Sequence, residues 1–383
     1  MKRTLLILFV LCSVLKAQTD YRLDTLMCRY IGPGTVYTRI KASAPWDIYV
    51  LRIDLKNPYI KVESIKAKDR YAGRELVSSM AARKSTEGHF ALGAVNGDFY
   101  DMSNGKTCNI QIENGEIIRT PASKISTIGF SSSNKPMLNF VSYSGNVIAS
   151  NGVSNRISNV NESRGTDQLI LYNSYMGDAT GTNSYGTEVL VRPVTAWGAN
   201  DTVKCVVEKI QNGAGNMQLT PSYAVLSGNG TSASFLSNNL KLGDTVKLYQ
   251  SVTPGLSKLT QMIGGYPKIV YKGLNYSQQG YFDEGGPDHY ANLDPRTGAG
   301  FSYDSTYLYL VALDGFENGS AGATLNQLAD VMISLGVCNG INLDGGGSTT
   351  MYVRGAVVNK PSDGTEREDA NSLAIFSSAP TKA

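Results

Sequence analysis

Histidine and tryptophan are scarce in this chain of 383 residues, with two of each, and charged residues make up only 17% of it. Because only His89 and His289 are present, a metal site built from several histidines is excluded. The sequence also lacks the motifs H-E-x-x-H, G-x-S-x-G and G-x-x-x-x-G-K-[ST], which argues against a zinc protease, a nucleophile-elbow hydrolase and a P-loop protein. Any acid–base chemistry must therefore come mostly from carboxylates.

The charge pattern lacks the marks of a nucleic-acid-binding protein. The formal net charge is only +3, and no basic run or alternation of basic and aromatic residues occurs. Glycine (40) and tyrosine (22) are abundant instead, which suits a strand-and-loop protein with a hydrogen-bonding surface, as in many sugar-handling proteins. We therefore expect no nucleic-acid partner.

Cysteine is also sparse, with one copy inside the first 17 residues and four beyond them. Those four contain no C-x-x-C pair, which argues against a zinc ribbon. They allow three disulfide pairings, and the sequence does not choose among them: Cys28, Cys108, Cys205 and Cys338. Cys338 lies in an apolar run, so we expect it to be a buried free thiol.

The first 17 residues have the pattern of an export signal. Lys2 and Arg3 are followed by an apolar run from Leu5 to Leu15, and Ala17 offers a small residue for cleavage. The run is shorter than the roughly 20 residues that span a bilayer, and no later segment is long and apolar enough to do so. We expect a periplasmic or secreted protein, cleaved near Ala17, without stable membrane insertion.

Alternation of apolar and polar residues predicts strands along most of the chain. Residues 46–65 form two such segments around Asn57-Pro58, which we interpret as an antiparallel pair, and Asn114-Gly115 predicts a tight hairpin. Residues 104–260 show no helix longer than two turns. We expect an α+β fold of strand-rich mixed sheets with a few helices, an N-terminal strand region over 18–70 and a β-rich subdomain at about 130–260.

Two helices are predicted from apolar residues at helical spacing. The first covers residues 74–84. The second begins at Thr324, where Gln327 completes a capping box, and ends at Gly336.

Three apolar strands end in the same kind of sequence, namely a short polar side chain next to glycine. The first leads to Asn96-Gly97-Asp98, the second to Asp314-Gly315, and the third to Asp344, Gly345, Gly346, Gly347 and Ser348. Ligand sites in sheets with helical crossovers collect at strand carboxyl ends, and glycine lets backbone N–H groups approach an anion. A single Asp-Gly is usually an ordinary turn, but three successive glycines after Asp344 favour a site.

Arg296, followed by Thr297 and Gly298, is a fourth candidate. An arginine can bind a carboxylate or phosphate through two parallel hydrogen bonds. In this setting it can equally form a structural ion pair, and the sequence favours neither role.

Several of these segments together resemble the phosphodiester glycosidase family. They are Asn96 to Tyr100, Pro295 to Gly300, Asp314-Gly315, the helix from Thr324, Ile341 to Thr349, and the tail from Glu366 to Phe376. The resemblance implies a phosphodiester glycosidase domain over about 71–383. The family usually has a small residue at the position of Asp98, so this extra carboxylate would mark a different substrate.

The resemblance implies an enzyme that cleaves the bond between a sugar, expected to be an N-acetylhexosamine, and a phosphodiester. Asp344 would act as nucleophile or base, with Asp314 as its partner or as a ligand of a sugar hydroxyl. The remaining binding residues would be Asn96 for the sugar, and Asp98, Arg296, Thr297, Gly345, Gly346, Gly347, Ser348 and Arg367. No cofactor and no metal ligand is expected, and Arg367 is equally compatible with a structural salt bridge.

Two alternatives remain open at this stage. One is a non-catalytic envelope protein that binds polysaccharide through the glycine-rich segment. The other is a metal-dependent phosphodiesterase, in which Asp98, Asp314 and Asp344 hold a divalent cation through oxygen ligands.

Overall fold

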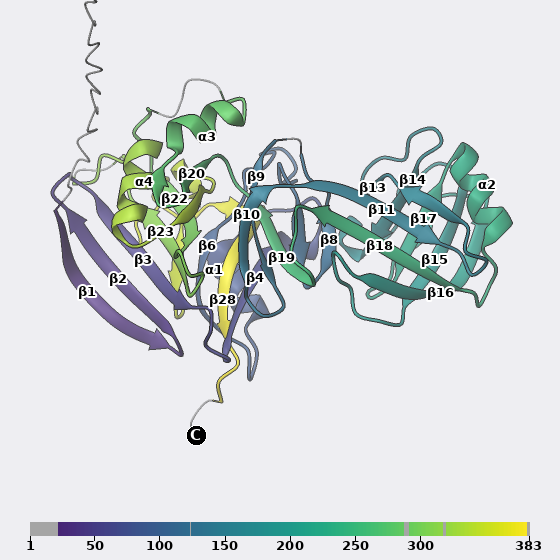
Figure 1. Cartoon of the computed structure of the whole chain (residues 1–383), viewed down its shortest axis with the longest axis horizontal. Coiled ribbons are helices and arrows are strands. Elements are labelled where there is room, and N and C mark those ends of the chain that lie inside the picture. Colours follow the sequence, from purple (N-terminus) through teal and green to yellow (C-terminus); the bar gives the residue numbers. More distant parts are fainter. Residues whose placement is uncertain (1–21, 123, 287–290, 317–318, 381–383) are drawn as a thin grey trace, which may run out of the picture.

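The computed structural model describes residues 22–122, 124–286, 291–316 and 319–380. The predicted export signal and His289 lie outside these ranges. Figure 1 shows a body, formed by the N-terminal and C-terminal parts of the chain, and a lobe of teal strands at the opposite end. The lobe is formed by the middle of the chain, so the chain leaves the body and returns to it.

The body contains an eight-stranded sheet, here called the large body sheet, in the order β1-β2-β3-β23-β22-β24-β20-β21. Its strands are β1 (Leu23–Gly32), β2 (Thr35–Ala42), β3 (Asp47–Asp54), β20 (Lys268–Tyr271), β21 (Leu274–Asn275), β22 (Arg296–Phe301), β23 (Tyr307–Leu313) and β24 (Asn339–Asn342). Helices α3 (Ser277–Asp283) and α4 (Leu325–Ser334) pack on it, and α4 begins with the predicted capping box of Thr324 and Gln327.

A second body sheet has the order β26-β25-β6-β28-β4, and a bridging sheet has the order β10-β9-β19-β7-β8. The second sheet comprises β4 (Ile60–Lys66), β6 (Phe90–Asn96), β25 (Met351–Val353), β26 (Ala356–Val357) and β28 (Asn371–Ser377), with α1 (Val77–Lys84) against it. The bridging sheet comprises β7 (Gln111–Glu113), β8 (Glu116–Arg119), β9 (Ser126–Ser131), β10 (Pro136–Phe140) and β19 (Leu259–Gly264). A short ribbon pairs β5 (Glu75–Leu76) with β27 (Glu368–Asp369). One apolar core joins the three body sheets.

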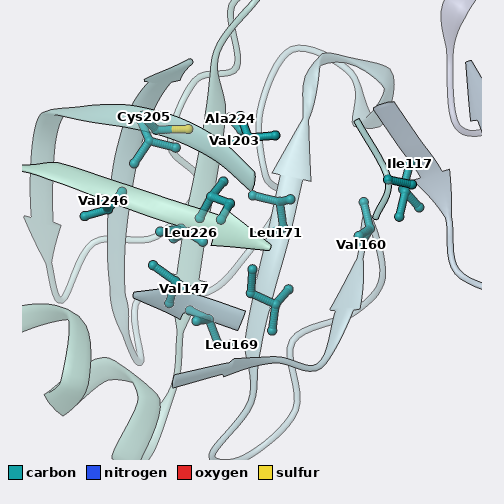
Figure 2. Close-up of a cluster of buried hydrophobic side chains, with 14 of the residues drawn as sticks. Ile117, Val147, Val160, Leu169, Leu171, Val203, Cys205, Ala224, Leu226 and Val246 are labelled. Atoms are coloured by element: carbon teal, nitrogen blue, oxygen red, sulfur yellow. The ribbon is translucent and has the colours of Figure 1, made fainter. Parts of the chain in front are cut away.

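The lobe is a separate eight-stranded sheet in the order β12-β11-β18-β16-β15-β17-β14-β13. Its strands are β11 (Ser142–Ile148), β12 (Ser154–Ile157), β13 (Asn159–Val160), β14 (Leu169–Asn173), β15 (Thr187–Pro193), β16 (Thr202–Asn212), β17 (Ala224–Gly228) and β18 (Thr245–Thr253). Figure 2 shows the aliphatic side chains that fill its core. Ile117 of the bridging sheet belongs to the same cluster, so the lobe and the bridging sheet share a core.

The strand-rich fold with few helices is confirmed, while two local predictions are wrong. The strands predicted within 46–65 exist as β3 and β4 but do not pair with each other, because β3 pairs with β2 and β23 whereas β4 pairs with β28. Residues 104–260 contain α2 (Gly230–Asn239), which is longer than two turns. Its serine, asparagine and glycine residues are weak helix formers, so packing against β15 and β17 stabilises a helix that local preference does not favour.

The hairpin predicted at Asn114-Gly115 is confirmed, since β7 and β8 flank it. A second hairpin pairs β25 with β26. Among the residues that the structure describes, no disulfide is formed by Cys28, Cys108, Cys205 or Cys338, and Cys338 is buried as predicted. Within the part of the chain that the structure describes, no helix has the length and apolarity needed to cross a membrane.

Antiparallel pairing brings the ends of some strands beside the beginnings of others. Asn342, at the end of β24, pairs with Gly298 near the start of β22, and Arg296 in turn pairs with Leu313 at the end of β23. In the second body sheet, Asn96 at the end of β6 pairs with Ser372 near the start of β28. Residues that begin a strand can therefore reach the same edge as residues that end one.

Candidate active site

Asp344 lies where the large body sheet meets the second body sheet. Its backbone N–H donates to Gly97 O (2.9 Å), and the Asn96 side chain donates to Asp344 O (2.7 Å). The segment after β24 is therefore fixed to the segment after β6. Of the three strand ends that the sequence singled out, those of β6 and β24 therefore lie side by side, although they belong to different sheets.

Asn96 and Thr297 are completely buried and form the frame beneath this segment. The Asn96 amide oxygen accepts from Thr297 Oγ1 (2.8 Å) and Thr350 N (3.1 Å), while its amide nitrogen donates to Asp344 O. Both ends of the amide are thus in use within the protein. This geometry favours a positioning role for Asn96 and Thr297 over the contact with substrate expected from the sequence.

Arg296 is likewise buried and turned toward protein groups. Its guanidinium donates to Ala323 O and Asn292 O (2.8 Å each) and forms an ion pair with Asp294 at 3.0 Å. Burial lowers the pKa of Arg296, and the Asp294 carboxylate opposes that effect. Of the two roles left open for this arginine, the geometry favours the structural ion pair.

The Asp314 carboxylate is held by hydrogen bonds from Asn359 and Lys360. Its Oδ1 accepts from Asn359 Nδ2 (3.2 Å) and Lys360 N (3.1 Å). Asn359 also donates to Thr349 O (2.9 Å). Asp314 is therefore linked through Asn359 to the end of the glycine-rich segment.

Asp369, on β27, is a further carboxylate that interacts electrostatically with Asp344. It is 2% exposed, and neither of its carboxylate oxygens has a hydrogen bond of good geometry to any described residue. Burial raises its pKa well above the ordinary value, and the Asp344 charge adds to the rise. Burial also raises the pKa of Asp344 to about 6, a rise opposed by the Ser348 hydroxyl, the Gly345 N–H and the Arg367 guanidinium. Two neighbouring acidic groups thus both have raised pKa values.

Three further side chains complete this centre, here called the Asp344 centre: Ser348, Tyr100 and Arg367. The Ser348 hydroxyl is fully buried near both carboxylates but is well aligned with neither, so it has no satisfactory partner among the described groups. Tyr100 donates to Glu368 O (3.0 Å), and burial, followed by the Asp369 charge, raises its pKa to about 12. Buried polar atoms without partners are rare in folded proteins, and here they surround two carboxylates.

Arg367 covers the glycine-rich segment. A Cβ atom at Gly347 would collide with its guanidinium, so the arginine packs directly on this glycine. The guanidinium pairs with Asp363 at 2.6 Å and its side chain remains 31% exposed. Arg367 therefore combines a structural salt bridge with access to solvent beside Asp344 and Asp369.

The backbone N–H groups of the glycine-rich segment are mostly used within the protein. Gly345 N donates to Asp344 Oδ1 (2.9 Å), Gly346 N to Pro295 O (3.0 Å) and Ser348 N to Gly345 O (3.2 Å). Gly346 adopts φ +60°, and a Cβ there would meet only open space. The segment thus orients the Asp344 carboxylate and leaves open space beside Gly346. It does not present a full set of free N–H groups to an anion.

Asp98 is buried behind the Asp344 centre. It accepts from Asn109 N (2.8 Å), and its own N–H donates to Asn371 Oδ1 (2.8 Å). Burial raises the pKa of Asp98 to about 7, and the Asp344 charge contributes to the rise. Within the described residues, no three histidine, cysteine, aspartate or glutamate side chains are grouped as metal ligands.

Reasoning from strand carboxyl ends missed Asp369 because it precedes a strand. It comes two residues before β28, which runs antiparallel to β6, so the beginning of β28 lies beside the Asn96 segment. The signal was present in the tail Glu366 to Phe376, where an acidic pair immediately precedes an apolar strand. Acidic residues at the beginnings of apolar strands are therefore the signal that identifies Asp369.

Known proteins share both sequence and fold with this chain. Residues 197–376 match the family model of the phosphodiester glycosidases. An 81-residue segment is 37% identical to the SPbeta prophage-derived protein YomE of Bacillus subtilis, covering 21% of this chain and only 12% of that protein. The chain therefore spans a small part of this curated relative.

Two solved structures have the same fold. A hypothetical protein from Synechocystis superposes with a TM-score of 0.65 at 17% identity, covering 93% of this chain and 68% of its own. A Burkholderia pseudomallei K96243 protein predicted to be exported superposes with a TM-score of 0.61 at 20% identity, covering 88% of this chain and 74% of its own. The family resemblance seen in the sequence is confirmed over residues 197–376, which match the phosphodiester glycosidase family and contain Asp344, Ser348, Arg367 and Asp369.

Proposed function

We propose that this protein is an exported hydrolase that cleaves the bond between the anomeric carbon of a sugar, such as an N-acetylhexosamine, and a phosphodiester oxygen. The family match supports glycosidase activity on a glycan-type substrate in general. The observation that carries the specific proposal is the interaction of the partly exposed Asp344 with the buried carboxylate of Asp369, beside the partly exposed Arg367.

The chemistry of the leaving group suits this arrangement. A departing phosphomonoester has a second pKa of about 6, so it leaves without strong proton donation. The reaction then needs a carboxylate to attack the anomeric carbon or to take a proton from attacking water, together with positive charge near the phosphate.

In the proposed mechanism, the ionised Asp344 supplies the attacking carboxylate or the base. Asp369, whose pKa is raised well above its ordinary value by burial, holds a proton and donates a hydrogen bond to substrate oxygen. Arg367 binds the phosphate through its guanidinium, and Ser348 supplies a further hydroxyl. Asn96, Thr297, Arg296 and Asp314 hold the segments that carry these groups.

Hydrolysis of an alkyl diester of N-acetylglucosamine-1-phosphate tests the proposal. We expect free N-acetylglucosamine and an alkyl phosphate as products, with turnover lost in Asp344→Asn. Tight binding of several such diesters without turnover would instead favour a polysaccharide-binding protein. Release of sugar-1-phosphate, with activity lost on adding a chelator, would favour a metal-dependent phosphodiesterase.

A further inference from the structure

A cavity of about 710 Å³ lies between the body and the lobe, and none of the residues that line it belongs to the Asp344 centre. Here called the interlobe pocket, it is lined from the body by Arg70, Lys84 and Glu116, and from the lobe by Tyr175, Asp178 and Trp197. Its volume lies within the range of pockets that hold small ligands.

The two sides of the pocket are fastened together at several points. Tyr71 N donates to Tyr175 O (2.6 Å), and Arg70 pairs with Asp178 at 2.8 Å. A Cβ at Gly115 would meet Trp197 O at 2.4 Å, so the turn between β7 and β8 packs directly against the lobe. The pocket is therefore defined by packed chain on both sides.

The charged side chains of the pocket are mostly paired with one another. Besides the ion pair of Arg70 and Asp178, Lys84 pairs with Asp69 (2.9 Å) and Glu113 (2.7 Å). Because these charges cancel locally, the pocket offers no concentrated positive charge for an anion. Hydrogen bonding and apolar contact remain as the means of holding a ligand.

Glu116 and Trp197 can provide hydrogen bonding and apolar contact to a ligand. Neither the Glu116 carboxylate nor the Trp197 indole N–H has a hydrogen-bond partner among the described residues, although both side chains are half-buried. Burial, followed by the nearby Glu113, raises the pKa of Glu116 to about 7, so the carboxyl group can donate as well as accept near neutral pH. An aromatic ring with adjacent unpaired hydrogen-bonding groups matches the surface of a pyranose, which has an apolar face and a rim of hydroxyls.

We infer that the interlobe pocket is a second carbohydrate site, which binds an uncharged oligosaccharide against Trp197 and Glu116. Such a site would hold a glycan chain away from the Asp344 centre. The inference does not depend on the chemistry proposed for Asp344, since a binding site here would persist if that chemistry were wrong.

The protein offers a direct optical test because it has only two tryptophans. Trp46 is 2% exposed in the body core and donates to Gly322 O, so added ligand should perturb mainly Trp197. We expect chitotriose, maltotriose or cellotriose to change tryptophan fluorescence saturably at millimolar concentration or below, with matching heat in calorimetry. Glu116→Leu, which removes the carboxyl group, should weaken binding about fivefold to tenfold, as expected for one hydrogen bond.

Controls separate this site from others. Trp197→Phe keeps most of the apolar bulk that packs on the lobe core but removes the N–H, and it should also weaken binding. Tyr303→Phe, at a side chain 89% exposed outside the pocket, should bind as the unmodified protein does. Asp344→Asn should abolish turnover while leaving this binding unchanged. The inference is overturned if none of the three sugars binds saturably, or if binding is unaffected by both Glu116→Leu and Trp197→Phe.

Discussion

Two sets of buried polar residues lie next to each other in this protein, and they differ in whether their hydrogen bonds are satisfied. In the first set, the side chains are hydrogen-bonded to other groups of the protein; this set comprises Asn96, Thr297, Arg296 and Asp314. Asp369 and Ser348 are just as buried but have side-chain oxygens without well-aligned partners. Leaving such atoms unpaired costs about 1–3 kcal/mol each, so they persist where function requires them. The first set is best interpreted as a frame and the second as the site that it holds.

The largest expected effect comes from Asp344→Asn, which removes the proposed attacking carboxylate but keeps its shape. We expect turnover of the sugar phosphodiester to fall by about a thousandfold or more, as for other residues that attack or act as base. Far-ultraviolet circular dichroism and the melting temperature serve as the folding control. A variant with near-native turnover would remove Asp344 from the mechanism.

Asp369→Asn should lower kcat by about a hundredfold, the usual effect of losing an acid–base group. It should also stabilise the protein at neutral pH, because it removes an unpaired buried carboxylate. The raised pKa of Asp369 means that folding is penalised as pH rises above the ordinary aspartate value of about 4, so the gain should vanish below that pH. Urea unfolding at neutral and acidic pH measures this gain, and a loss of stability at neutral pH would contradict the assignment.

The pH profile tests the protonation state of Asp344. Because its pKa is raised to about 6, kcat/KM should fall about tenfold for each pH unit below 6. The phosphodiester itself does not titrate there, so the acid limb reports on the enzyme. A flat profile down to the ordinary aspartate range would mean that the reacting carboxylate does not have the raised pKa assigned to Asp344.

Arg367→Gln should raise KM by about tenfold to a hundredfold, since a charge-assisted contact with phosphate contributes about 1.5–3 kcal/mol. Arg367→Lys should recover part of the loss because it keeps the charge but not the planar fork. If Arg367→Gln altered only the melting temperature, the salt bridge with Asp363 would be its whole role.

The smallest effect on activity is expected for Asp314→Asn, a change within the frame. It should lower the free energy of unfolding by about 1–3 kcal/mol, because the bonds with Asn359 and Lys360 N are weakened. We expect kcat/KM of the folded variant to stay within about threefold, or about 0.6 kcal/mol. A thousandfold loss would return Asp314 to the catalytic role that the sequence suggested.

The sequence predicts the location of the candidate site better than the roles within it. Glycine after Asp344 and the capping box at Thr324 are local signals, and both appear in the structure where expected. The partners of Arg296, Asn96 and Asp314 are distant in sequence, so their use as frame residues depends on tertiary packing that no local pattern encodes. Asp369 was missed for a similar reason, since only antiparallel pairing brings the beginning of β28 to the end of β6.

The most direct test of the central claim is hydrolysis of a sugar-1-phosphodiester in water labelled with the heavy oxygen isotope. If Asp344 and Asp369 act at the anomeric carbon, mass spectrometry analysed promptly after the reaction will find the label in the released sugar and none in the phosphate. Label in the phosphate would show attack at phosphorus, and would contradict the proposal that this protein is a phosphodiester glycosidase.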